Sequence, residues 1–370
     1  MNAEESRPVS QERVMAVDAL RGFDMFSIVG GGEMVRRAIR IFADPMPGPI
    51  ARQFGHVQWE GFAAWDLIMP LFLFIVGTSM PLAYARRMER GQTRRDLYVH
   101  MIRRVAILWV LGMIAQGNLL TFDPAKIHFY SNTLQAIASG YAIATVVMLN
   151  VGVMGQVIST AALLVLYWLL LTFVPAPGIG AGVLESHANL ALYVDEFILG
   201  RFRDGTTYTW ILSSITFGAT VLLGVMSGHM LRAVKPARTK ALWLFGSGIA
   251  GIALGLLWGL WSPIIKHIWT SSFVLYAAGW SFLLLAAFYC IVDVLQFRRW
   301  AFGFVVIGMN AIVAYMIGEL FSVGFIEDRL FGEAAHKMPA SAAFSLSVIV
   351  FGIFWLGLYL MYRKKIFVRI

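Results

Sequence analysis

Long continuous apolar stretches constrain this chain more than any other feature of its sequence. About 20 predominantly apolar residues span the hydrocarbon core of a membrane as a helix, and several such stretches occur here. Of the 370 residues, 59% are hydrophobic and 14% are charged, whereas a water-soluble domain carries about 25% charged residues. The composition excludes a soluble domain and intrinsic disorder. The single cysteine, Cys290, excludes a disulfide-rich scaffold.

Ten segments are expected to cross the membrane, which predicts an all-α, polytopic helical bundle that forms one transmembrane domain over residues 1–370. The first segment has the weakest signal because it carries several charged residues. The fourth and fifth form a tight hairpin, since only Asn150–Gly152 separates them. The expected segments are residues 15–35, 62–85, 99–120, 132–150, 152–174, 208–231, 241–261, 271–295, 300–323 and 341–362.

The distribution of lysine and arginine predicts the orientation of the bundle. With residues 1–13 as a cytoplasmic tail, 19 of the 30 basic residues fall on the cytoplasmic side, 10 fall outside and Arg21 lies within the first segment. Positive residues concentrate in cytoplasmic loops, so both termini are expected in the cytoplasm. The net charge of +9 is then a consequence of topology and predicts no nucleic-acid partner. Some of these arginines could also contact anionic lipid or a phosphorylated cofactor.

Three outer loops are long enough either to cover a site or to act as solvated connections. They are residues 36–61, 175–207 and 324–340. Their acidic and histidine residues include Asp195 in the second loop and, in the third, Glu327, Asp328, Glu333 and His336.

Charged residues within the first segment need an internal explanation. Asp18, Arg21 and Asp24 follow one another at intervals of three, which places them on neighbouring parts of one helix face. A charge at the centre of a membrane helix costs roughly 2.5–3.5 kcal/mol. The three residues could form an internal ion pair or line a polar cavity. Gly30–Gly32 then predicts either a close backbone approach or a broken helix.

The densest group of polar residues lies just before and within the second segment, where His56 precedes Asp66 by ten residues. If a helix begins near Gly61, Asp66 lies about 7–8 Å along its axis, and the preceding loop can fold His56 over the helix end. A carboxylate bound to one ring nitrogen fixes the tautomer and raises the basicity of the other nitrogen. The pair therefore suits acid–base or nucleophilic chemistry. Alternatively, His56 is a loop residue and Asp66 caps a buried helix end.

Other polar residues within or beside the segments have ordinary structural explanations as well. Asn310 in the middle of a segment could join two helices by hydrogen bonds, and Gln135 is expected to be a further buried polar residue. Lys266 and His267 lie at an outer edge, where long polar side chains reach toward water. The sequence contains no His-Glu-x-x-His, P-loop or Gly-x-Ser-x-Gly motif, which disfavours metal, nucleotide and serine-hydrolase sites.

Taken together, several of these stretches resemble the heparan-alpha-glucosaminide N-acetyltransferase family, including its bacterial relatives. The similar stretches follow the family order and extend over most of the chain. They are Val17–Gly22, Gly30–Gly32, His56–Gly61, Asp66–Gly77, Leu134–Gln135, Gly308–Asn310 and Tyr362–Phe367.

This resemblance implies a multi-pass enzyme that takes acetyl-CoA from the cytosol and acetylates a glucosamine amine on the far side of the membrane. The active histidine and acidic residue of the family match His56 and Asp66. Two departures concern the acceptor more than the fold, because Glu60 and Ile28 stand where the family has asparagine.

The chemistry expected of such an enzyme assigns roles to the polar residues. His56 deprotonates the acceptor amine or attacks the thioester itself, and Asp66 orients its ring. Candidate donors to the developing oxyanion are Asn310, Gln135 and Lys266. Because His56 lies on the outer side and acetyl-CoA in the cytosol, a polar path is expected. The residues expected to line this path are Asp18, Arg21, Asn310 and Gln135, and those expected at the acceptor are Trp59 and Glu60.

The expected surroundings are those of a multi-pass protein of the bacterial inner membrane, with an amino sugar or glycan as acceptor, membrane lipid as neighbour and no metal. A glycine stripe that includes Gly246, Gly248, Gly251 and Gly255 could support a homodimer, although packing within one chain is the commoner use. Two other functions stay open: O-acylation of a glycan or lipid headgroup, and proton-coupled transport. The absence of a clear two-fold repeat of the segments disfavours transport.

Overall fold

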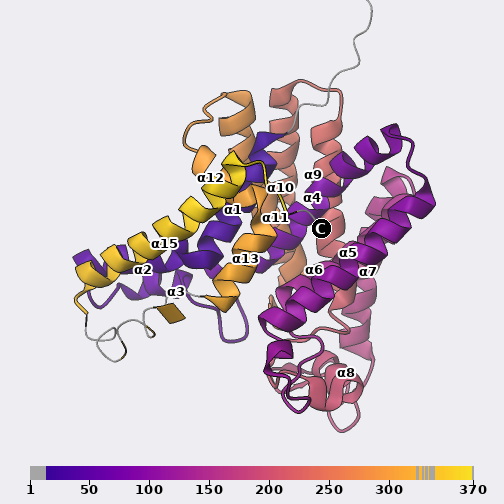
Figure 1. Cartoon of the computed structure of the whole chain (residues 1–370). Coiled ribbons are helices and arrows are strands. Elements are labelled where there is room, and N and C mark those ends of the chain that lie inside the picture. Colours follow the sequence, from indigo (N-terminus) through magenta and orange to yellow (C-terminus); the bar gives the residue numbers. More distant parts are fainter. Residues whose placement is uncertain (1–13, 322–324, 327–328, 330–331, 333–337, 369–370) are drawn as a thin grey trace, which may run out of the picture.

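The computed structural model describes residues 14–321 and 338–368, together with residues 325, 326, 329 and 332 between them. It is an all-α bundle, as predicted (Figure 1). The two strands within the described part have two residues each and pair antiparallel. The helices are α1 (Met15–Phe26), α2 (Gly32–Phe42), α3 (Gly48–Gln53), α4 (Ile68–Glu89), α5 (Arg94–Ala115), α6 (Thr133–Asn150), α7 (Val153–Phe173), α8 (Leu190–Leu199), α9 (Ser214–Arg232), α10 (Ala237–Gly259), α11 (Ser271–Tyr289), α12 (Phe302–Met309), α13 (Ala311–Leu320) and α15 (Ala340–Arg363).

Shorter elements connect these helices. They are the π-helical segments Ser27–Gly31 and Cys290–Val294, the 3₁₀ turns Ala64–Leu67, Leu119–Thr121 and Gly200–Phe202, and the strands β1 (Leu184–Glu185) and β2 (Ala188–Asn189). The predicted cytoplasmic tail, residues 1–13, lies outside the described residues, as do Glu327, Asp328, Glu333 and His336 of the third outer loop.

Eight helices of the described part are long and apolar enough to cross a membrane, and a ninth span results if α12 and α13 are counted together. The sequence predicted ten segments, and the difference lies in the first one. There the chain forms α1, a π-helical segment and α2, and Gly30 in the π-helical segment has a φ of 148°. Because that break leaves helices of 12 and 11 residues, neither is long enough alone. The break at the glycine triplet agrees with one of the two predicted outcomes.

Glycines set the distance between the central helices. A β-carbon at Gly77 of α4 would lie 1.9 Å from the carbonyl oxygen of Val221 in α9, and one at Gly224 would lie 2.0 Å from that of Phe74. Both distances are far inside van der Waals contact, so only glycine permits this approach. The α4 and α9 helices lie side by side in Figure 1, and they are the most deeply buried of the described spans.

The glycine stripe of α10 packs mainly within the chain. A β-carbon at Gly251 or Gly255 would meet the backbone of α11 at 2.9 Å and 2.5 Å. Gly246, by contrast, has open space around it. This arrangement agrees with the intramolecular alternative for the stripe.

The second of the predicted outer loops, residues 175–207, is more ordered than a simple connection. It contains β1, β2 and α8, and α8 lies at the lower edge of the bundle in Figure 1. The buried carboxylate of Asp195 accepts hydrogen bonds from the backbone N–H groups of Trp210 and Ile211, at 2.7 and 2.9 Å. These bonds attach α8 to the start of the segment that leads into α9.

Candidate active site

The loop after α3 brings His56 against Asp66 at the start of the α4 span. Nδ1 of His56 lies 2.8 Å from Oδ1 of Asp66, and Oδ2 of the same carboxylate accepts the backbone N–H groups of Val57 and Ala63 at 3.3 and 3.0 Å. The Asp66 side chain is 1% exposed, whereas that of His56 is 47% exposed. Asp66 is therefore held from two sides, and it aims the ring so that Nε2 faces away from the carboxylate.

A third charged residue completes this cluster. Lys266, in the loop between α10 and α11, places Nζ 3.2 Å from Oδ1 of Asp66 and 3.1 Å from Nδ1 of His56. Its side chain is 8% exposed, so the expectation that Lys266 reaches toward water is wrong. Burial lowers the pKa of Lys266, and the charge of Asp66 opposes that shift.

Backbone hydrogen bonds explain why residues 200 positions apart meet here. Glu60 and Ile265 form an antiparallel bridge, and the N–H of Gly61 donates to the carbonyl of Ile264 at 2.9 Å. Gly61 has a φ of +117°, a conformation that suits glycine. The two loops thus form one unit that carries the His56, Asp66 and Lys266 side chains, called here the triad.

Aromatic rings form a wall beside the triad. The His267 ring stacks on Tyr208 at 4.0 Å, and Trp59 meets its edge at 5.5 Å. Burial, together with the positive charge of Lys266, lowers the pKa of His267 to about 4, so this ring is neutral near pH 7.

Of the two residues expected at the acceptor, Trp59 is half-buried at this wall and Glu60 is exposed. The stacked pair of His267 and Tyr208 had no signal in the sequence, because 59 positions separate the two rings.

A second polar region lies farther along α4. A cavity of about 530 Å³ opens between α1, α4, α5 and α6, and its walls carry five arginines against one carboxylate, that of Asp18. Arg21 donates to Asp18 at 3.2 Å and to the Ser79 hydroxyl at 2.5 Å. Both outcomes predicted for the first segment therefore occur, because Asp18 and Arg21 form an ion pair and also line a cavity. The arginines are Arg21, Arg86, Arg87, Arg90 and Arg104.

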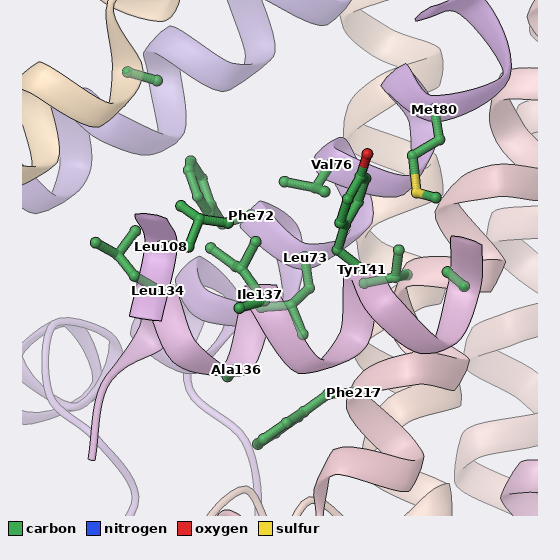
Figure 2. Close-up of a cluster of buried hydrophobic side chains, with 14 of the residues drawn as sticks. Phe72, Leu73, Val76, Met80, Leu108, Leu134, Ala136, Ile137, Tyr141 and Phe217 are labelled. Atoms are coloured by element: carbon green, nitrogen blue, oxygen red, sulfur yellow. The ribbon is translucent and has the colours of Figure 1, made fainter. Parts of the chain in front are cut away.

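The other end of this cavity is apolar. Figure 2 shows Phe72 and Val76 of α4 facing Leu108 of α5 and Ile137 and Tyr141 of α6, and all five line the cavity. Because a helix rises 1.5 Å per residue, Phe72 lies about 9 Å along the axis from Asp66. The cavity thus extends from the basic turn between α4 and α5 toward the triad.

Two residues predicted to line the polar path lie elsewhere. Gln135 is buried, where its amide accepts from the N–H of Ser131 and donates to the carbonyl of Phe129. Asn310 lies at the 81° bend between α12 and α13 and bonds the chain after α15, through the carbonyl of Ile366 and the N–H of Val368. Neither residue is among those that line the cavity, although Val368 is.

Buried Asp24 differs from the other first-segment charges, because neither carboxylate oxygen has a hydrogen-bond partner among the described residues. The part of the chain that the structure describes also contains no group of three or more histidine, cysteine or acidic residues that could bind a metal ion.

Comparison with known proteins finds two relatives whose similarity covers nearly the whole chain. Human heparan-alpha-glucosaminide N-acetyltransferase is 25% identical over 97% of this chain, and the mouse protein of the same name is 24% identical over 99%. The chain spans about 60% of the length of these curated relatives. No protein-family profile matches it.

Proposed function

We propose, from the membership in the heparan-alpha-glucosaminide N-acetyltransferase family that these two relatives support, that the protein is a transmembrane N-acetyltransferase. It moves an acetyl group from acetyl-CoA to the amine of a glucosamine-type sugar or glycan. The observation that carries this proposal is that one helix, α4, has the His56–Asp66 pair at its start and the arginine-rich cavity along the rest of its length.

The cavity has the chemistry that acetyl-CoA requires. Among the described residues, no carboxylate forms an ion pair with Arg86, Arg87 or Arg104. Arginines without a countercharge bind phosphate groups strongly and in a defined geometry, and CoA carries such groups at one end. The apolar end near Phe72 suits the pantetheine arm, whose thioester would then point toward the triad.

The orientation of the protein is part of this proposal. The basic turn between α4 and α5 faces the cytosol, where acetyl-CoA is found, and the triad faces the outer side. Both termini are then cytoplasmic, and the membrane is the bacterial inner membrane. Acetyl-CoA enters the cavity from the basic side, while the sugar approaches the triad next to the ring of Trp59.

The geometry of His56 suits two routes of transfer. With Nδ1–H donating to Asp66, the lone pair of Nε2 is free, and Nε2 has no partner among the described residues. In the first route Nε2 takes a proton from the acceptor ammonium, the amine attacks the acetyl carbonyl carbon, the C–S bond breaks and the thiolate receives a proton. In the second route Nε2 attacks the thioester and carries the acetyl group to the amine.

Transfer assays test the proposal directly. Purified protein in detergent is incubated with acetyl-labelled acetyl-CoA and glucosamine, a glucosaminide and matched alcohols. We expect labelled N-acetyl product that His56→Ala abolishes and that His187→Ala, a change at an exposed loop histidine, does not. Product that persists in His56→Ala would contradict the role of His56.

The same assay separates the alternatives. Label found on hydroxyl acceptors would indicate an O-acyltransferase, and absence of acetyl-CoA binding would contradict the proposed cavity. Parallel double-reciprocal lines with both substrates varied would favour the acetyl-histidine route, whereas intersecting lines would favour direct transfer.

A further inference from the structure

Lys266 is buried more deeply than its charge would suggest. A buried ammonium is costly unless it is paired and hydrogen-bonded, and the described partners of Nζ are the two groups proposed for the chemistry, His56 and Asp66. The loop around it is well anchored, because Thr270 donates to the carbonyl of Pro263 at 2.9 Å and accepts the N–H of Ile265 at 3.1 Å. The position of Lys266 is therefore built into the fold.

The short contact between Lys266 and His56 restricts where the ring can carry its hydrogens. An ammonium has three donors and no lone pair. If Lys266 donates to Nδ1, the ring hydrogen lies on Nε2, which then has no lone pair for the reaction. If Lys266 instead donates to Asp66 only, Nδ1–H can donate to the same oxygen and Nε2 is free. In both arrangements the ammonium opposes a second positive charge on the ring.

We propose that Lys266 is a positioning residue whose ammonium, 3.1 Å from Nδ1 of His56, opposes a second positive charge on the ring and so expels the proton that Nε2 gains during transfer. This inference rests on the proposed acetyl transfer. The proton leaves the acceptor amine for Nε2, the amine lone pair forms the N–C bond, and the C–S bond breaks with its electron pair on sulfur. The imidazolium next to Lys266 then releases its proton to the thiolate, which yields the free thiol of CoA.

The charged and titratable groups around the triad are consistent with this role. Asp66 is the countercharge, and His267 follows Lys266 in the same loop. Tyr208 stacks on His267 from the segment before α9, and exposed Glu60 forms an isolated bridge with Ile265. Burial, and after it the positive charge of Lys266, lowers the pKa of the His267 ring in the same loop.

The pH dependence of kcat/KM tests the inference. Lys266→Met removes the positive charge 3.1 Å from Nδ1 of His56 that opposes a charged ring. We therefore expect the acidic limb of the profile to move up by roughly one to two pH units in Lys266→Met. Lys266→Arg retains the charge and should keep the limb near its wild-type position. A limb that does not move in Lys266→Met would overturn the inference.

Two further measurements keep the test decisive. Lys266→Gln removes the charge but retains donors for Asp66, so it replaces Lys266→Met if that variant does not fold, with the same expected shift. Titration of the ring by ¹⁵N-histidine NMR, assigned with His56→Ala, needs no turnover. A midpoint that rises in the neutral variants supports the action of the Lys266 charge on the His56 ring, and the transfer assay tests separately whether that action serves acetyl transfer. An unchanged midpoint in an enzyme that does transfer acetyl overturns this inference and leaves the proposed function intact.

Discussion

The charged groups at the two ends of the α4 span have opposite surroundings, since one set is paired and buried and the other lines an open cavity. At its start, Asp66 is fully buried and its oxygens are all bound, by His56, Lys266 and two backbone N–H groups. Toward its end, arginines surround an open cavity whose single carboxylate already pairs with Arg21. Charges that satisfy one another are preorganised for chemistry, whereas charges that face an open volume are suited to an anionic ligand. Under the proposed function, this difference suits one end to catalysis and the other to binding of acetyl-CoA.

The largest effect is expected when the buried charge of Asp66 is removed from the triad. Asp66→Asn releases the His56 ring and leaves Lys266 buried without its countercharge. We expect kcat to fall about 1,000-fold and the free energy of unfolding to drop by about 3–5 kcal/mol, the cost of removing one partner of a buried pair. Turnover and thermal unfolding measure the two effects. Asp123→Asn, which alters a surface ion pair with Lys126, should change neither, and a fully active Asp66→Asn protein would contradict the assignment.

Changes at the open end should affect binding instead of chemistry. Replacing Arg87 and Arg104 together by glutamine is expected to raise the KM for acetyl-CoA about tenfold or more, because two charge-assisted contacts to phosphate are lost. The value of kcat should stay within about twofold, since the triad is unchanged. The control is Arg94→Gln, an exposed arginine of the same turn that does not line the cavity. A fall in kcat at unchanged KM would show that the two ends are not separate in function.

A smaller effect is expected where the chain after α15 forms part of the cavity wall. Asn310→Ala removes both hydrogen bonds to residues 366 and 368 and should cost about 1–3 kcal/mol. Trypsin should then cleave faster at the basic residues Arg363–Lys365, and the KM for acetyl-CoA should rise modestly. Asn150→Ala, at the α6–α7 turn, serves as the comparison. Equal cleavage rates in the two variants would argue against the conclusion that Asn310 anchors the chain after α15.

The effect expected to be smallest near pH 7, and to appear only in acid, concerns the neutral ring beside the triad. The pKa of folded His267 is about 4, below the ordinary value near 6.5, so the unfolded chain binds the proton more readily between these values. The neutral His267 ring therefore makes its full contribution to the free energy of unfolding above about pH 6.5, and this contribution is lost as the pH falls toward 4. The Tm of the wild type should therefore fall more steeply over this window than that of His267→Phe, which retains stacking on Tyr208. Parallel Tm curves would exclude this contribution.

Much of the fold could be predicted because membrane insertion leaves a strong local signal. The α6, α7 and α15 helices begin and end within about two residues of the predicted segments, since continuous apolar stretches and their turn residues define them directly. The first segment could not be resolved in this way. The effect of a glycine triplet depends on which helix packs beside it, and here α2 bends away to lie along α15 (Figure 1).

The candidate site likewise has one part that local sequence predicts and one part that depends on helix packing. The sequence by itself determined the membrane-spanning class and drew attention to His56 and Asp66, because ten residues of loop and one helix start bring them together locally. Only the tertiary structure decided that Lys266 joins them and that Arg21 lines one cavity with the arginines of α4 and α5. It also decided that Gln135 and Asn310 bond the backbone instead of lining that cavity. Local spacing can predict contacts within one turn or loop, but contacts across 200 residues depend on how whole helices pack.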